Sequence, residues 1–274
     1  MGRCILAIGK DFSDNPIWNE TAKNHNIKLI TLSWCEIVRF TSIRTCHRKQ
    51  KILIGDALRL QCDKLLGVLH FDVARLDMSS MQTEGVNYVK LAWQAWWLSM
   101  QPHLKQIVNK AHHKHYCAEF WSAPSVYQQA KKCGLEVAEW VCDSRANTGK
   151  KHNEESKRIK VFSVIEQPGE KVLCLVVGHK VFSIGDLAVS EVISMPRDIP
   201  SKLQALRLRL SLTVMEVYFK QYQDSWVLHG IRPKPNWDNW RKIEHYNAVW
   251  QLLKSKQEKQ RRCLISKKRR PIIV

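Results

Sequence analysis

The chain has 274 residues, enough for one large domain or two modest ones with a sizeable hydrophobic core. Its composition is globular, but the formal net charge of +19 favours an acidic partner such as nucleic acid, an anionic membrane surface or a phosphorylated ligand. The nine cysteines are scattered and never spaced C-x-x-C, which argues against a disulfide framework and indicates a reduced, cytoplasmic protein.

The N-terminal residues have a strand–helix–strand pattern. Residues 4–8 form an apolar run that predicts a first strand and is too short for a signal peptide. Asn15 and Pro16 open a helix that should extend to about Asn24, and residues 27–34 are rich in strand formers. A βαβ unit of this length predicts an α/β fold with parallel strands. No stretch reaches the length needed to span a bilayer, so we expect no membrane association.

The next segment alternates short apolar runs with helical patterns. We expect a helix over residues 86–100, a short strand over 106–109, a helix over 122–133 closed by Gly134, and a strand over 135–142. Residues 143–160 are polar and carry charges of both signs, which predicts a mobile linker. We therefore place a domain boundary there, with residues 1–142 before it.

Residues 160–184 predict an antiparallel meander, the central element of the second half. Pro168 and Gly169 mark one turn and Gly178 and His179 another, while residues 172–177 are apolar at almost every position. Such a run indicates a strand buried on both faces. After it come a helix over 201–211 capped by Ser201, two strands over 214–221 and 226–230, and a last helix over 240–256. The second half is therefore predicted to be a smaller α+β lobe over residues 161–253.

Residues 254–274 form a basic tail, predicted to be solvated and partly disordered. Together with Arg207, Arg209 and the aromatic Trp237, Trp240 and Trp250, the tail suggests a surface that follows phosphates. This hypothesis of nucleic-acid binding rests on eight candidate residues: Lys254, Lys256, Arg261, Arg262, Lys267, Lys268, Arg269 and Arg270.

Other candidate sites are weaker. His112, His113, His115 and Cys117 lie close together, but no second ligand pair follows at zinc-site spacing, and we interpret them as a basic loop without metal. The sequence contains neither a phosphate-binding P-loop nor the G-x-S-x-G pattern of a nucleophile elbow.

The order and spacing of these elements resemble the ATP-grasp family, in particular the stand-alone bacterial ATP-grasp ligases that modify peptides. The βαβ start is similar to their pre-ATP-grasp domain. Residues 107–110 stand where these ligases have an apolar strand ending in Asn-Arg-Pro, and residues 168–178 are similar to their Pro-Gly-x-x-x-Arg-x-x-Val-Val-Gly segment. The resemblance covers nearly the whole chain and implies an ATP-grasp-like C-terminal lobe.

The departures from the family are as informative. The family's first lobe, with a lysine that pairs with phosphate, has only residues 143–160 in its place. The hairpin arginine is replaced by Leu173. The metal-binding Glu-x-Asn corresponds to residues 230–232, where Gly230 and Arg232 replace the carboxylate and the amide, and an arginine would repel a magnesium ion.

The resemblance thus predicts a degenerate ATP-grasp-like pseudoenzyme without cofactor, acting as a non-catalytic binding or partner subunit of a peptide-modifying system. Its partner would be an intact ATP-grasp enzyme or a peptide substrate. One alternative is an active ATP-dependent carboxylate–amine ligase with rearranged ligands that uses ATP and Mg²⁺. In it Lys150, Lys151 and Lys160 would approach phosphate, and Glu166, Glu170 or Glu216 would hold the metal. A second alternative is the nucleic-acid-binding protein.

Overall fold

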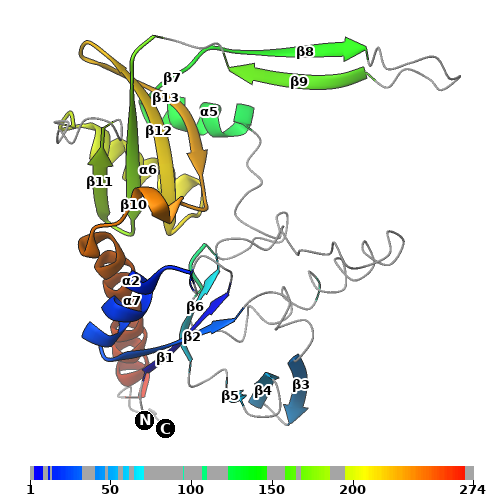
Figure 1. Cartoon of the computed structure of the whole chain (residues 1–274), viewed down its shortest axis with the longest axis vertical. Coiled ribbons are helices and arrows are strands. Elements are labelled where there is room, and N and C mark those ends of the chain that lie inside the picture. The colour runs from blue at the N-terminus through cyan, green and yellow to red at the C-terminus, as the bar shows by residue number, and fades with distance from the viewer. Residues whose placement is uncertain are drawn as a thin grey trace, which may run out of the picture.

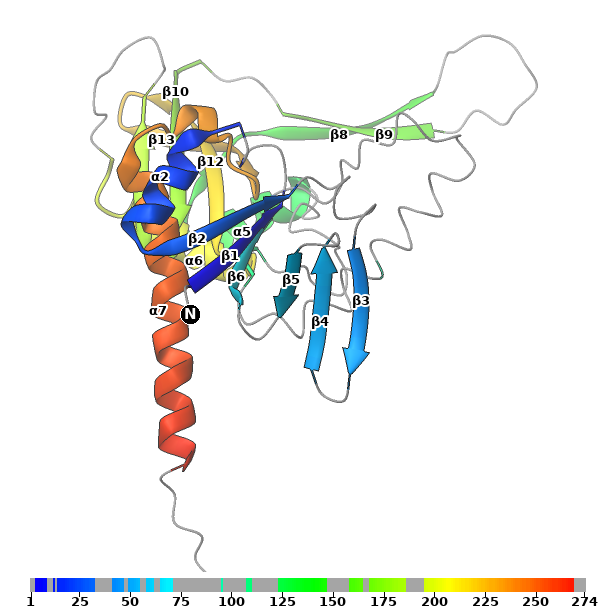
Figure 2. The ribbon, with the colours of Figure 1, turned by 60° about the horizontal axis from the view of Figure 1, so that its bottom comes forward.

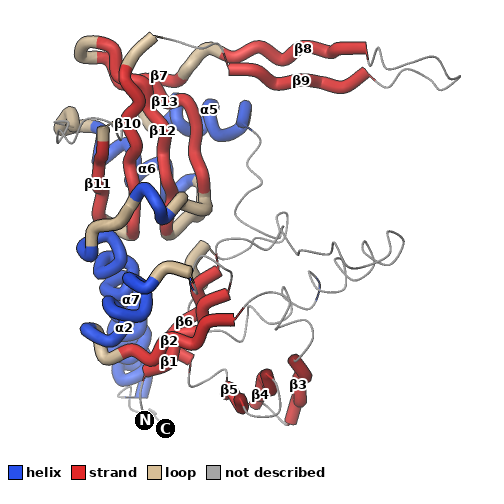
Figure 3. Tube along the Cα trace, viewed as in Figure 1, coloured by secondary structure: helices blue, strands red, loops and turns tan. Residues whose placement is uncertain are grey.

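The computed structural model describes residues 3–8, 12, 14–32, 41–46, 49–54, 58–61, 65–70, 95, 107–109, 123–146, 158–164, 168–185 and 195–268. Within these residues the chain is a mixed α/β protein with a parallel sheet near the N-terminus and a larger mixed sheet built mostly from the second half (Figures 1 and 3). This agrees with the predicted fold class.

The N-terminal sheet contains the predicted βαβ unit. Strand β1 (Arg3–Ile8) pairs in parallel with β2 (Ile27–Leu32), and α2 (Pro16–Asn24) connects them. The side chain of Asn15 caps α2 by accepting a hydrogen bond from the Ile17 amide at 3.1 Å. Strand β6 (Leu65–His70) adds to the other side of β1, also in parallel. The predicted βαβ start is therefore confirmed.

Between β2 and β6 the chain forms a separate antiparallel sheet that the sequence patterns do not predict. Its strands are β3 (Thr41–Cys46), β4 (Lys49–Ile54) and β5 (Leu58–Gln61), paired in that order (Figure 2).

The larger sheet has the strand order β11-β10-β12-β13-β7. Its antiparallel part consists of β10 (Glu170–Val177), β11 (Lys180–Ile184), β12 (Val214–Tyr222) and β13 (Ser225–Arg232), and β7 (Glu136–Val137) joins β13 in parallel. Residues 172–177 are all at most 3% exposed, as predicted for a strand buried on both faces. Helices α5 (Ala123–Lys132) and α6 (Ile199–Arg209) cover one face and lie behind the strands in Figure 1.

The opposite face of this sheet shares a core with the N-terminal part. Leu173 and Leu175 of β10 belong to the same buried cluster as Ile5 of β1 and Trp18 of α2. Helix α7 (Ile243–Lys268) packs against α2, β6 and β10 and contributes Trp250 to this cluster. The division of the chain into domains stays a prediction, but the two predicted domains bury side chains against each other.

Two local predictions are wrong. Residues 143–160 are not a linker throughout, because β8 (Trp140–Ala146) and β9 (Arg158–Val164) pair as an antiparallel hairpin that extends away from the main body in Figure 2. Helix α6 begins at Ile199, two residues before the predicted cap Ser201, with Asp198 at its N-cap. Its Pro200 fits the first turn, because proline has no amide hydrogen to leave unpaired there.

The last helix is longer than predicted, and the basic residues up to Lys268 continue it instead of forming a disordered tail. Trp237, Trp240 and Trp250 are at most 3% exposed, so they belong to the core and do not form a surface for stacking bases. Arg207 is 7% exposed and donates to the Leu212 carbonyl at 2.9 Å, so it is not part of a phosphate-binding surface. No helix among the described residues is long and apolar enough to cross a membrane.

Candidate functional site

The candidate site lies on the face of the large sheet opposite α5 and α6. Side chains alternate between the faces of a strand, so the register decides which of them share this face. Leu175 pairs with Glu216, Leu173 with Tyr218 and Lys171 with Lys220. On the other side of β12, Arg232 pairs with Glu216 and Gly230 with Tyr218. The residues that correspond to the Glu-x-Asn positions therefore lie directly beside Glu216.

Glu216 is fully buried and surrounded by hydrogen-bond donors. Its Oε1 accepts from Trp240 Nε1 at 2.8 Å and from Asn239 Nδ2 at 3.3 Å. Its Oε2 accepts from the Tyr218 hydroxyl at 3.1 Å and from the Asn236 amide at 3.3 Å. Three of these donors come from the segment around the 3-10 helix η4 (Trp237–Asn239), which thereby covers this end of the sheet face. The carboxylate ties this segment to β12.

Next to Glu216 on this face, two cations approach the ring of Tyr218. The Arg232 guanidinium carbon lies 4.6 Å from the ring centroid and the Lys171 ammonium nitrogen 5.2 Å from it, which are cation–π distances. Burial, followed by the charge of Glu216, raises the pKa of Tyr218 to about 12, so the hydroxyl keeps its proton and donates to Glu216. Lys171 and Arg232 are exposed, so their charges reach the solvent.

Asn109 fixes the edge of this region. It has a left-handed backbone with φ of 53°, which asparagine tolerates better than most residues. Its Oδ1 accepts from the amides of Thr213 and Val214 at 2.8 and 2.9 Å, and its Nδ2 donates to the carbonyls of Val214 and Pro233 at 2.8 and 2.7 Å. This side chain holds the start of β12 and the end of β13 in register with residues 107–109.

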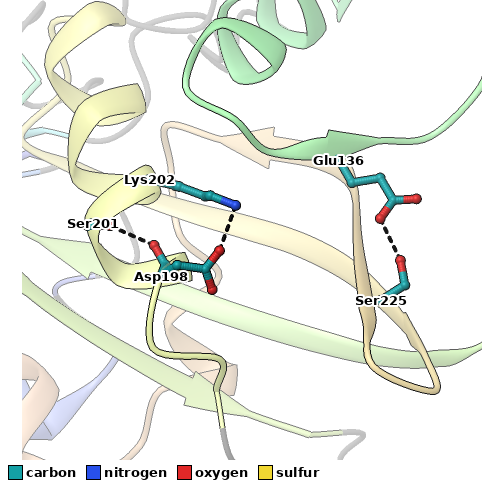
Figure 4. Close-up of polar contacts among 5 residues, drawn as sticks. All are labelled: Glu136, Asp198, Ser201, Lys202 and Ser225. Carbon is teal, nitrogen blue, oxygen red and sulfur yellow. Dashed lines mark hydrogen bonds and ion pairs between the residues drawn. The ribbon is translucent and has the colours of Figure 1, made fainter.

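Polar contacts elsewhere on the sheet are peripheral. Ser225 donates to Glu136 at 2.5 Å and joins β13 to β7, while Lys202 pairs with Asp198 at 2.6 Å in the first turn of α6 (Figure 4). The side-chain hydrogen bond from Lys202 is the main cause that lowers the pKa of Asp198. These residues stabilise element ends and do not converge on a common point.

The structure does not bring the predicted metal ligands Glu170 and Glu216 together. Glu170 pairs with Gln221, five residues along β12 from Glu216, which is roughly 17 Å along the strand. The odd spacing also places the two side chains on opposite faces of the sheet. Lys160 lies on β9 opposite Ser144, and the predicted residues Lys150, Lys151 and Glu166 lie outside the described residues.

Most of the predicted nucleic-acid residues lie on α7, which carries Lys254, Lys256, Arg261, Arg262, Lys267 and Lys268. Lys254 is half-buried and donates to His25 Nδ1 at 3.1 Å, so it also fastens α7 to the end of α2. Arg269, Arg270, the histidine cluster of residues 112–117 and the predicted helix over 86–100, apart from Ala95, lie outside the described residues.

The sequence matches no protein-family model and no curated protein. Solved structures match over nearly the whole chain. The ATP-grasp ligase PsnB complexed with minimal precursor is 10% identical, with a TM-score of 0.68 over 93% of this chain and 100% of that one. The macrocyclase MdnC from Microcystis aeruginosa MRC, bound with precursor peptide MdnA, is 11% identical, with a TM-score of 0.63 over 89% of this chain and 98% of that one.

This chain has an ATP-grasp-like fold. The likeness extends to D-alanine–D-alanine ligase from Bacillus anthracis complexed with ATP, which is 10% identical with a TM-score of 0.53 over 94% of this chain and 99% of that one. The ATP-grasp resemblance of the sequence is therefore confirmed at the level of the fold.

The residues of this ATP-grasp-like face do not fit a magnesium ion. Magnesium prefers six oxygen ligands at about 2.0–2.1 Å, whereas both oxygens of Glu216 already accept hydrogen bonds and the residue is 0% exposed. Gly230 supplies no side-chain ligand, and Arg232 brings a positive charge. Among the described residues, no group of three or more His, Cys, Asp or Glu could hold a metal ion.

The sequence does not predict the residues that donate to Glu216. It places Trp240 on a phosphate-binding surface and does not distinguish Asn236 and Asn239. The available signal was the spacing Asn236-Trp237-Asp238-Asn239-Trp240, in which polar side chains alternate with tryptophans between a strand and a helix. Buried indole N–H groups need acceptors, and a carboxylate on the neighbouring strand can supply one.

Proposed function

We propose that this ATP-grasp-like chain is degenerate and non-catalytic, and that it acts as a binding or partner subunit of a peptide-modifying system. The observation that carries the proposal is the hydrogen bonding of Glu216. Its carboxylate already accepts hydrogen bonds from four donors of its own chain, and its cross-strand neighbour is Arg232. A catalytic metal would have to displace these hydrogen bonds and tolerate the guanidinium.

The comparisons support the peptide part of the proposal. MdnC is described with its precursor peptide MdnA, and a ligase from Chryseobacterium gregarium is described with ADP and a leader and core peptide. The latter is 10% identical, with a TM-score of 0.62 over 93% of this chain and 97% of that one. We infer that this chain uses the same scaffold to bind a peptide or an intact ATP-grasp enzyme that processes one.

Titration calorimetry of the full chain with ATP and excess magnesium tests the proposal. We expect a dissociation constant of roughly a millimolar or weaker, and no rise in melting temperature, because a ligand stabilises a protein only as far as it binds the folded state. A dissociation constant in the low micromolar range would contradict the proposal. It would favour the active ligase, with ligands drawn from Lys150, Lys151, Lys160 or Glu166.

A further inference from the structure

The sheet face that fits magnesium poorly has the residues of an anion site. We call Lys171, Tyr218, Gly230 and Arg232 the cationic face. The register places all four on the same side of β10, β12 and β13, so cations from the two strands that flank β12 share one surface. Both cations lie against the ring of Tyr218, at 4.6 Å for Arg232 and 5.2 Å for Lys171, which brings them within reach of one small ligand.

The carboxylate beside these two cations does not reach the solvent. Glu216 is fully buried, and its oxygens accept hydrogen bonds from Trp240, Asn239, Asn236 and Tyr218. Lys171 and Arg232, by contrast, are exposed and lie against the Tyr218 ring, which limits the conformations of their long side chains. The face therefore presents partly ordered positive charge to the solvent.

Gly230 leaves room for a ligand between these groups. It pairs with Tyr218 and is two residues before Arg232 on β13. A Cβ atom added at Gly230 would meet no atom of the described residues within 4 Å, so none of them fills the space above this position. The open position is flanked by the guanidinium of Arg232 on its own strand and by the Tyr218 ring on the next.

We propose that the cationic face binds a phosphate-bearing anion directly, without a divalent metal. A guanidinium matches two phosphate oxygens with a planar pair of N–H donors, and an ammonium adds a further charge-assisted hydrogen bond. Arg232 and Lys171 then supply the positive charge that magnesium would otherwise supply to a phosphate chain. The inference concerns the ligand of this face and rests on the proposed lack of magnesium chemistry there.

A charge insertion at Gly230 gives the sharpest test. Gly230→Glu places a carboxylate in the open space beside Arg232, while Gly230→Gln adds the same bulk without charge. The full chain is titrated with pyrophosphate in buffer containing a chelator. We expect Gly230→Glu to weaken binding by at least about tenfold and Gly230→Gln by less than about threefold, since the loss comes from charge and not from volume.

A second pair of variants separates the site from general basic charge. Lys171→Gln with Arg232→Gln removes two cations from the face, and Lys131→Gln with Lys132→Gln removes two exposed cations from α5, behind the sheet. We expect the first pair to lose at least about tenfold in pyrophosphate affinity and the second to lose less than about twofold. Circular dichroism of each variant checks that it is folded. Equal losses in both pairs would overturn the proposal.

The metal dependence distinguishes this inference from the proposed function. Excess magnesium should weaken pyrophosphate binding, because it neutralises the ligand, while the oxygens of Glu216 are buried and already hydrogen-bonded. Binding that requires magnesium would overturn both proposals. A complete lack of pyrophosphate binding at low salt would overturn this inference alone. Comparing ATP with tripolyphosphate shows whether the ligand is a nucleotide or a free polyphosphate. Tighter binding of either one supports the proposal.

Discussion

At the scale of single residues, Glu216 decides how the site is interpreted. A structural carboxylate and a metal ligand respond differently to Glu216→Gln. The amide removes one acceptor and brings an N–H group toward the donors of Trp240, Asn239 and Asn236. We expect the free energy of unfolding to fall by about 2 kcal/mol, equally in magnesium and in chelator, as measured by urea denaturation.

A matched control for this substitution is Glu136→Gln. Glu136 is an exposed carboxylate that accepts one hydrogen bond from Ser225, so its change should cost less than about 0.5 kcal/mol. Magnesium that stabilises the wild type but not Glu216→Gln would show that the carboxylate holds a metal ion.

His245 gives the stability a pH dependence. It is 2% exposed, its ring stacks edge-on against Trp240 and Phe182, and burial lowers its pKa from 6.5. The unfolded chain therefore takes up the proton first as the pH falls. The contribution of His245 to stability is complete above pH 6.5 and is lost below it, by at most about 1.4 kcal/mol per pH unit.

His245→Gln removes this titration, so the variant should lose less stability than the wild type between about pH 7.5 and 5.5 in urea denaturation series. The charged neighbours Glu244, 3.8 Å from Nε2, and Lys242 have opposite effects on the His245 pKa. Parallel pH profiles of variant and wild type would show that other groups set the dependence.

At the scale of elements, α7 has a packed half and an extended half. Tyr246, Trp250 and Leu253 are at most 1% exposed and belong to the core, and Lys254 fastens the helix to His25. Beyond Ser255 the helix continues to Lys268 and runs clear of the sheets in Figure 2. The stability of the fold should therefore depend on the first half alone.

Truncation after Ser255 tests both the fold and the nucleic-acid hypothesis. It removes all but Lys254 of the basic residues predicted to bind phosphates. We expect the free energy of unfolding to change by less than about 0.5 kcal/mol. If the full chain binds labelled duplex DNA, the plot of log affinity against log salt concentration should become less steep by about 0.9 for each phosphate contact that is removed. An unchanged slope would show that DNA binds to another part of the chain. If the full chain does not bind DNA even at low salt, the nucleic-acid hypothesis is wrong.

Helices and strands were predictable where a local sequence pattern alone identifies them. The apolar run over 172–177 and the turn at Gly178 identify β10 and its hairpin, and Gly134 correctly ends α5. The apolar residues of β9 predict a strand, but the predicted meander pairs that strand with β10, whereas it pairs with β8 in a separate sheet. The local pattern of a strand does not specify which other strand it pairs with. The high charge of residues 257–268 predicts a disordered tail, but their lysines, arginines and glutamines are also good helix formers, and the helix continues through them.

The site was less predictable than the fold. The sequence names Glu216 as a candidate metal ligand. Three of its four hydrogen-bond donors come from residues 236–240, and only the fold of that segment over β12 shows that they occupy the carboxylate oxygens. The core positions of Trp237 and Trp250 depend on packing against Trp18 of α2, and that of Trp240 on its hydrogen bond to Glu216, which charge and aromatic content cannot reveal.

At the scale of the whole molecule, the N- and C-terminal parts complete each other's core. Trp18 of α2 stacks against Trp237 and Tyr246, with ring centroids 4.7 Å apart in both pairs, and against Trp250 at 5.3 Å. Thr21 accepts a hydrogen bond from the Trp250 indole at 2.8 Å. The buried side of the first helix thus packs against residues from the last quarter of the chain.

Residues 1–142, expressed alone, should therefore not form a stable domain, although the sequence predicts a boundary after them. The fragment lacks Trp237, Tyr246 and Trp250, so it exposes Trp18 and the apolar side of α2. We expect no cooperative urea transition and poor dispersion of its amide proton spectrum, while the full chain unfolds in one transition. A cooperatively folding fragment would show that the first domain is independent.

The pairing of α2 with α7 also governs how the protein is made. Thr21 and its partner Trp250 are 229 residues apart, and ribosomes add roughly 5–20 residues per second. The nascent N-terminal segment therefore waits roughly 10–50 s with Trp18 uncovered before its partners leave the ribosome. During that interval its apolar surface is available to other chains, so chaperones that shield hydrophobic segments should determine the yield of the protein in the cell.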